Sequence, residues 1–139
     1  MQRAFWKSLL LAAAVTVAGC DNDIDTAPDD DPPTVTDTFT GSINPNGAST
    51  HTFPVAVAGT VTATLTEVTP DATIAVGFAL GTWNATSSIC QLSLPTDNAV
   101  QGHILTGQVT GPAGTLCARI YDTGKLTGSI NYTITVVHP

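Results

Sequence analysis

Apolar side chains recur at every second position in four stretches of the chain. Residues 60–66 alternate threonine with Val, Ala or Leu, and residues 73–80 alternate large apolar side chains with small ones. The same period of two appears at 116–121 and at 130–136. Successive side chains of a β-strand point to opposite faces, so this period predicts strands with one face buried and the other in water.

Four weaker strands are predicted near 38–43, 50–57, 88–94 and 103–110. Clusters of Gly, Pro, Asn and Asp, which favour turns, separate the eight strands. These clusters lie at 44–47, 58–59, 69–71, 95–98, 111–114 and 122–125. About eight short strands with such spacing predict an antiparallel β-sandwich over residues 38–139.

Threonine dominates the polar positions of this block. Residues 38–139 contain 20 threonines, and no stretch shows a helical period. Threonine favours the pleated backbone and keeps the solvent face of a sheet soluble. The block is long enough to bury a single core, so we expect one domain.

The N-terminus has the layout of a secretory signal peptide. Arg3 and Lys7 precede the apolar run 9–15, and small residues lead to Cys20. The ending Val-Ala-Gly-Cys resembles the lipobox of bacterial lipoproteins, which implies that residues 1–19 are cleaved and that Cys20 carries lipid. The alternative is an uncleaved membrane anchor, but the uncharged run 8–20 is shorter than the roughly 20 residues that a spanning helix needs.

Lipidation of Cys20 predicts the location of the protein. Two or more acyl chains, such as a diacylglyceryl group and a palmitate, hold a protein firmly to a bilayer. We therefore expect anchorage to the inner or outer membrane of a bacterial cell envelope, with the domain in the periplasm or at the cell surface. Asp21 resembles the signal for inner-membrane retention in enteric bacteria.

Residues 20–37 form a predicted tether between the lipid and the domain. Asp and Pro dominate this stretch, which cannot bury enough apolar surface to offset the entropy of ordering, so we expect it to be disordered. Alternating aspartates at 21, 23 and 25 suggest a calcium loop, but Thr26 and Pro32 stand where that loop needs Gly and Glu. A solvated acidic stem is the expectation.

Charge narrows the possible partners. The whole chain has a formal net charge of −7, and loss of Arg3 and Lys7 leaves two basic residues against 11 acidic ones, a net charge of −9. A chain with so little positive charge cannot neutralise phosphates, so we expect no nucleic acid partner.

The three cysteines divide into one lipid site and one pair. With Cys20 lipidated, Cys90 and Cys117 remain as an even pair in an oxidising compartment, and we expect a disulfide between them. The alternative is a pair of free thiols or metal ligands, although isolated cysteines without CxxC spacing make a poor metal site.

Two stretches near the C-terminus resemble the last two strands of the bacterial pre-peptidase C-terminal domain. They are residues 113–122, with a Gly-Thr turn, an Arg and a Tyr-Asp end, and residues 130–136. Segments 38–41, 51–55, 58–61 and 72–76 resemble earlier strands of the family, although an Asp-rich segment is missing and Leu116 replaces a common Tyr. The resemblance implies a jelly-roll-like sandwich that binds surfaces, polymers or sometimes calcium, with no catalytic residue.

Catalytic and metal-binding motifs are weak in this chain. His51, His103 and His138 fit no metal signature, and no G-x-S-x-G elbow is present. Ser88, His103 and Asp122 could form a triad only by an unusual geometry, because triads are defined in space. We expect no catalytic residue, no metal and no cofactor.

Trp83 and Arg119 are the candidate contact residues. Trp83 follows a strong strand, within a polar stretch where an exposed indole could stack on a sugar ring or anchor a partner. The alternative is a lid that covers one end of the sandwich near the disulfide. Arg119 is expected to pair with Asp122 or another acid, to stack on an aromatic ring, or to hold a ligand carboxylate.

Together these features predict an exported, membrane-anchored binding or adhesion module without catalytic activity. It would hold a partner protein, a polysaccharide or envelope material, and free strand edges would also permit self-association. The competing hypotheses are a small envelope hydrolase with an unrecognised site and a structural subunit of an envelope complex or appendage.

Overall fold

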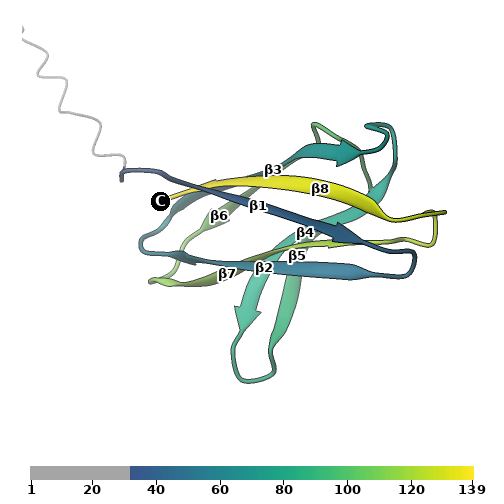
Figure 1. Cartoon of the computed structure of the whole chain (residues 1–139). Helices are drawn as coiled ribbons and strands as arrows, with labels where there is room; N and C mark the ends of the chain where they lie inside the picture. Colours follow the sequence, from purple (N-terminus) through teal and green to yellow (C-terminus); the bar gives the residue numbers. More distant parts are fainter. Residues whose placement is uncertain (1–31) are drawn as a thin grey trace, which may run out of the picture. The chain divides into compact units, whose positions relative to one another are not determined.

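Eight β-strands make up the part of the chain that the structure, a computed structural model, describes, residues 32–139 (Figure 1). Cys20, the predicted signal peptide and most of the predicted tether lie outside these residues. No helix that could span a membrane occurs within 32–139. The strands are β1 (Val35–Ile43), β2 (Ala48–Val55), β3 (Gly59–Thr69), β4 (Val76–Asn84), β5 (Ile89–Ala99), β6 (Ile104–Val109), β7 (Gly114–Tyr121) and β8 (Ile130–His138).

The strands form two four-stranded antiparallel sheets that pack face to face. Sheet A has the order β1-β8-β3-β6, and sheet B has the order β2-β7-β4-β5. This order is that of an eight-stranded jelly roll, in which consecutive strands alternate between the sheets except for β4 and β5, which form a hairpin within sheet B. The predicted all-β sandwich is confirmed, and all eight predicted strands are present.

The inner faces of both sheets supply the core, as the period of two predicts. Burial of these side chains removes apolar surface from water at about 25 cal/mol per Å². The largest fully buried side chains are Phe53, Phe78, Leu65, Ile120, Ile130 and Ile134.

The domain begins earlier than the sequence predicts. Val35, Thr36 and Asp37 pair with the end of β8, so these three residues belong to the sandwich and the expected tether boundary at 37 is wrong. Asp37 accepts a hydrogen bond from His138 at 3.0 Å. This long-range contact stabilises the ordered strand, and the Asp- and Pro-rich composition of the segment does not reveal it.

One predicted turn is part of a strand. Residues 95–98 lie inside β5, where the pairing with β4 shifts register between Val76 and Phe78. A bulge of this kind leaves extra residues on one strand and bends it. The turn-forming residues at 95–98 therefore distort an edge strand, and β5 continues to Ala99.

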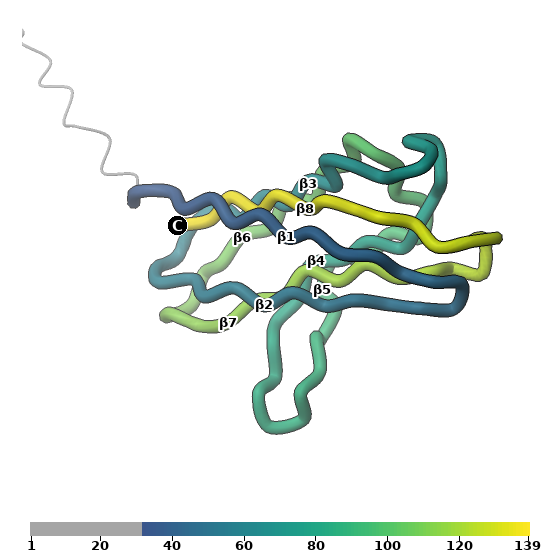
Figure 2. The backbone as a smooth tube through the Cα atoms, in the orientation of Figure 1, coloured from purple at the N-terminus to yellow at the C-terminus, as the bar shows by residue number. Residues whose placement is uncertain are grey.

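The two ends of the described chain lie side by side. Val35 at the start of β1 pairs with His138 at the end of β8. Figure 2 shows the start of β1 beside the C-terminus. On the outer face of sheet A, threonines align across strands, with Thr38 and Thr64 both opposite Thr135.

Candidate functional site

The ends of β4 and β5 leave the sandwich as a hairpin that projects from sheet B (Figure 1). Its tip, residues 85–88, is closed by Asn84, whose side-chain oxygen accepts hydrogen bonds from the backbone N–H groups of Thr86 at 3.0 Å and Ser87 at 3.1 Å. Ser88 adopts a positive φ of 54°. We call residues 82–91 the projecting hairpin.

A register shift at Leu80 and Gly81 marks the base of the projecting hairpin. Leu80 pairs with Leu94 but Gly81 pairs with Leu92, so Ser93 is an extra residue on β5. Gly81 permits a close approach there, because a Cβ at this position would lie 2.2 Å from the carbonyl oxygen of Gln91. The bulge and the glycine together let the strands bend out of the sheet.

The predicted disulfide is present and lies at the same base. Cys90 on β5 is bonded to Cys117 on β7, with their Cα atoms 5.9 Å apart. These two strands flank β4 in sheet B. The disulfide therefore links the β5 arm of the projecting hairpin to β7 on the outer face of sheet B.

Trp83 lies in β4, directly opposite Cys90, and not in the polar loop expected from the sequence. Directly opposite residues in an antiparallel pair share one face, so the indole is on the same side as the disulfide. The side chain is half-buried. The indole is therefore partly accessible to a partner.

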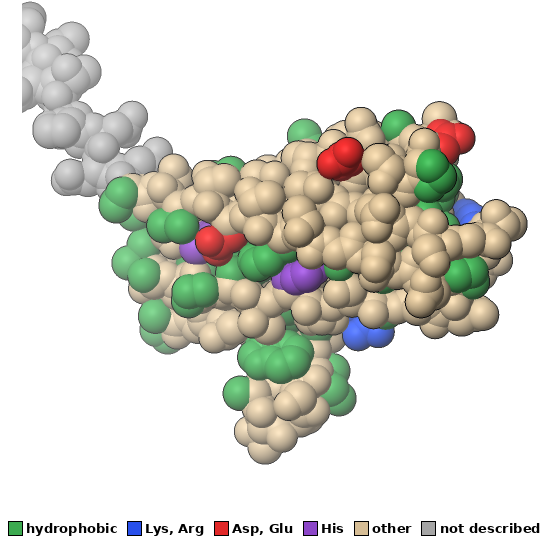
Figure 3. Space-filling model, viewed as in Figure 1, with side chains coloured by type: hydrophobic (Ala, Val, Ile, Leu, Met, Phe, Trp, Pro, Cys, Tyr) green, Lys and Arg blue, Asp and Glu red, His purple; other side chains and the backbone are tan. Residues whose placement is uncertain are grey.

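Apolar groups are also exposed on the second arm of the hairpin. Ile89 is 54% exposed, and Leu92, which pairs with Gly81 at the base of the hairpin, is 42% exposed. Figure 3 shows hydrophobic side chains along the projecting hairpin, which stands clear of the body of the domain. Exposed aromatic and aliphatic groups on a rigid projection are typical of a contact surface.

A hollow of about 450 Å³ lies beside the hairpin on the outer face of sheet B. We call it the outer hollow. It is lined by Asn46, Cys90, Leu92, Arg119, Tyr121 and Asp122, among others. Arg119 is half-buried there, between Thr50 and Ala79 in the register of the sheet.

Arg119 forms no ion pair with any carboxylate of residues 32–139, so the predicted pairing with Asp122 is wrong. The carboxylate of Asp122 lines the same hollow but accepts hydrogen bonds from four backbone N–H groups, those of Asn46, Gly124, Lys125 and Leu126. These bonds, that of Asn46 first, lower the pKa of Asp122. The guanidinium is left available for a ligand.

Tyr121 forms one wall of the outer hollow and is held in place from two sides. Its ring lies over Gly77, where a Cβ would approach it to 2.1 Å. Its hydroxyl donates to Asp97 at 2.7 Å. Burial, and then this hydrogen bond, raise the pKa of Tyr121, so the phenol stays protonated at neutral pH.

The three histidines lie in separate places. The Nε2 atom of His51 and the hydroxyl of Tyr132 form a hydrogen bond of 2.8 Å, and Phe39 stacks on the same imidazole with ring centroids 4.8 Å apart. Burial lowers the pKa of His51. His138 bonds to Asp37, and His103 lies between β5 and β6. Within residues 32–139, no group of three His, Cys, Asp or Glu side chains could hold a metal ion.

The candidate triad is not assembled in the described part of the chain. Ser88 is at the tip of the projecting hairpin, and Asp122 has its carboxylate occupied by backbone donors. His103 precedes β6, and no hydrogen bond joins the three side chains in this structure. The arrangement offers no activated nucleophile at these residues.

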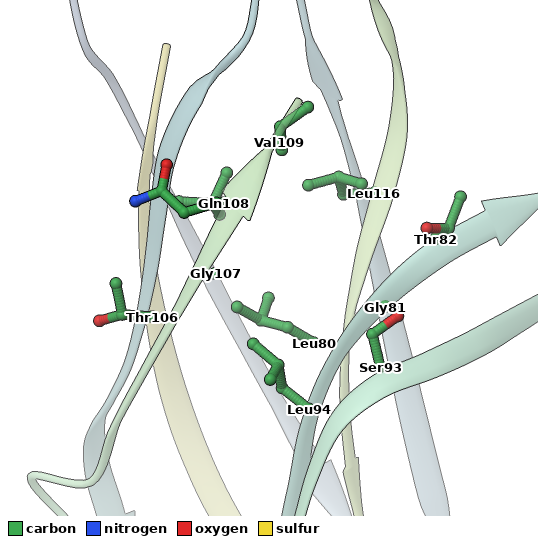
Figure 4. Close-up of a pocket in the computed structure, with 11 residues that line it drawn as sticks. Leu80, Gly81, Thr82, Ser93, Leu94, Thr106, Gly107, Gln108, Val109 and Leu116 are labelled. Carbon is green, nitrogen blue, oxygen red and sulfur yellow. The ribbon is translucent and has the colours of Figure 1, made fainter. Parts of the chain in front are cut away.

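A second cavity, of about 360 Å³, opens between β6 and the β4–β5 pair. We call it the edge crevice. Leu80, Leu94 and Leu116 point into it, and Thr106 and Gln108 of β6 line its rim (Figure 4). The edge crevice exposes apolar side chains between the two sheets and lies on the opposite side of β5 from the outer hollow.

No protein-family model matches the chain, and no similar curated protein is found. The resemblance to the pre-peptidase C-terminal domain therefore stays a prediction. The outer hollow and the edge crevice were not predicted from the sequence. The alternation in β7, which places Cys117, Arg119 and Tyr121 on one face, is the signal that could have grouped them.

Proposed function

We propose that this protein is an exported, lipid-anchored, non-catalytic module that holds envelope material through the projecting hairpin and the outer hollow. The partner is a protein, a polysaccharide or other material of the cell envelope. One observation carries the proposal: a hairpin with a half-buried Trp83 is fixed by a disulfide beside a hollow whose guanidinium has no carboxylate partner among residues 32–139.

The chemistry of the hollow favours a polar partner group. Arginine presents several N–H donors in a fixed plane that matches carboxylates and other paired acceptors. Trp83 and Leu92 add apolar surface at the base of the hairpin, where an aromatic ring can pack against a sugar ring or an apolar side chain. The disulfide fixes these groups in advance, which reduces the entropy lost on binding.

Lipid anchorage is supported by the lipobox-like segment that ends in Cys20. The disulfide between Cys90 and Cys117 also fits an exported protein, because disulfides persist in oxidising compartments. Mass spectrometry of the N-terminal peptide from the purified protein tests this part directly. We expect residues 1–19 to be missing and Cys20 to carry fatty acyl groups. An intact unmodified N-terminus would refute the anchorage.

Binding is tested by capture of two envelope fractions, cell-wall polysaccharide and membrane protein, on the immobilised full chain. Trp83→Ala removes a large aromatic contact, and we expect a loss of about 2 kcal/mol, roughly 30-fold in affinity, if the indole is a central contact. Arg119→Gln should also weaken capture. Val35→Ala, at an exposed apolar residue of β1 in the other sheet, and Lys125→Gln, which removes the other cation after residue 37, are the matched controls.

Unchanged capture by both Trp83→Ala and Arg119→Gln would contradict the assignment to the hairpin and hollow. The fraction retained by the parent chain identifies the partner class. Weaker capture by Lys125→Gln as well would indicate a general charge effect and not a built site.

A further inference from the structure

The four edge strands of the sandwich differ in their protection against pairing with another chain. An edge strand presents unpaired backbone N–H and C=O groups, and natural proteins block them with Pro, bulges or charges. β2 carries Pro54, and β5 carries Pro95 and two register shifts. β1 carries Asp37, which turns inward to His138.

β6 carries none of these devices. Its six residues, Ile-Leu-Thr-Gly-Gln-Val, include no proline and no charge, and they pair with β3 on one side only, without a register shift. A strand of this kind is ready to pair along its free side.

Exposed apolar side chains lie beside this unprotected edge. Of the seven large hydrophobic residues exposed in the described part of the chain, Ile104 lies on β6 and Leu94 lines the edge crevice beside it. Ile104, the first residue of β6, is 57% exposed. The apolar edge crevice, which includes Leu94 and Val109, opens directly behind the strand. A two-fold interface uses the same surface on both copies, so each copy would bring its Ile104 and the mouth of its crevice to the shared edge.

We infer that β6 pairs antiparallel with β6 of a second copy of this chain, so that sheet A continues across a two-fold dimer. We assign a second copy of this chain as the partner because β6 is uncharged, so two copies of the strand can meet without like-charge repulsion. The pairing satisfies the free backbone groups of β6 and covers Ile104 and the mouth of the edge crevice.

The dimer closes without forming a fibre. Sheet A has only two edges, and its other edge, β1, is protected by Asp37. A two-fold contact uses the same surface on both copies, so it leaves no equivalent surface free for a third. The projecting hairpin and the outer hollow belong to sheet B and stay accessible.

Cross-linking of the full chain tests this dimer. Thr106 is near the middle of β6 and exposed, and a two-fold axis at this point brings it close to its counterpart. We expect Thr106→Cys to form a disulfide-linked dimer under mild oxidation on a non-reducing gel. Thr38→Cys is the matched control, because Thr38 is an exposed threonine on the outer face of the opposite edge strand. Thr38→Cys should form no disulfide-linked dimer on the same gel.

A charge at the interface provides the second variant. Ile104→Lys places an ammonium group at the edge and should raise the dimer dissociation constant at least about tenfold, as measured by sedimentation equilibrium in density-matched detergent. Val35→Lys makes the same change at an exposed residue of β1 and should have no effect. A parent chain that sediments with the mass of one copy, or Thr38→Cys cross-linking as well as Thr106→Cys, would overturn the inference.

Discussion

Cys90 and Cys117 lie on two strands that do not pair with each other, yet their Cα atoms are 5.9 Å apart. β4 lies between the two strands in sheet B, and Gly81 is the β4 residue that pairs with Cys117. The approach is possible because β5 rises out of the sheet at its register shift. The disulfide therefore fixes the direction of the projecting hairpin.

Removal of this disulfide should destabilise the domain. The bond closes a loop with a sequence separation of 27 residues, which corresponds to about 3.5 kcal/mol on the chain-entropy estimate. We expect the Cys90→Ala/Cys117→Ala double variant to lose a stability of this order in urea unfolding. Reduction of the parent chain should also make residues 82–91 more sensitive to protease. If the hairpin were equally resistant to protease before and after reduction, strand pairing alone would be sufficient to fix its position.

Gly81→Ala should damage the base of the hairpin. A Cβ there would meet the backbone oxygen of Gln91 at 2.2 Å, and backbone cannot give way as a flexible side chain can. We expect a loss of about 1–3 kcal/mol in the free energy of unfolding, as for overpacked sites. Gly111→Ala, where a Cβ would meet nothing within 4 Å, is the control and should leave stability unchanged.

Acid should weaken the fold through His51. Burial lowers its pKa from the ordinary value of 6.5, so the unfolded chain binds a proton more readily than the folded chain does. The stability contributed by the neutral imidazole is complete above pH 6.5 and is lost as the pH falls through the lowered pKa. Between about pH 7.5 and about pH 5, the free energy of unfolding in urea should fall less for His51→Gln than for the parent chain. An equal loss would exclude His51 as the source.

Asp122 should be required for the position of two loops. Its carboxylate joins Asn46 in the β1–β2 turn to the segment after β7. Hydrogen bonds lower its pKa, so its contribution is present above the ordinary value of 3.8 and is lost as the pH falls through the lowered value. Asp122→Asn should lower the melting temperature at neutral pH. Glu67→Gln, a change at an exposed carboxylate, should not.

Strand positions and the disulfide could be predicted because each depends on a local or countable signal. The period of two marks β3, β4, β7 and β8, and the number of cysteines leaves one pair. The hairpin could not be predicted, because its bend comes from the way that β4 and β5 register against each other. The pairing of Asp37 with His138 spans 101 residues, and no local pattern reveals such a contact.

The outer hollow depends on similar long-range relationships. Arg119 was expected to pair with Asp122, three residues away in sequence, but that carboxylate turns to the backbone of its own loop and of Asn46. The difference in protection among the four edges could be read from the sequence only once the strand order was known.

The pairing of Val35 with His138 has a consequence for how the chain can be rearranged. Domains whose ends are neighbours tolerate circular permutation, in which a short linker joins the old ends and a loop is cut to make new ones. A cut between Thr86 and Ser87 would divide the hairpin tip. The segment ending at Thr86 would still continue from β4, which pairs with β7. The segment beginning at Ser87 would stay linked to β7 through the disulfide of Cys90.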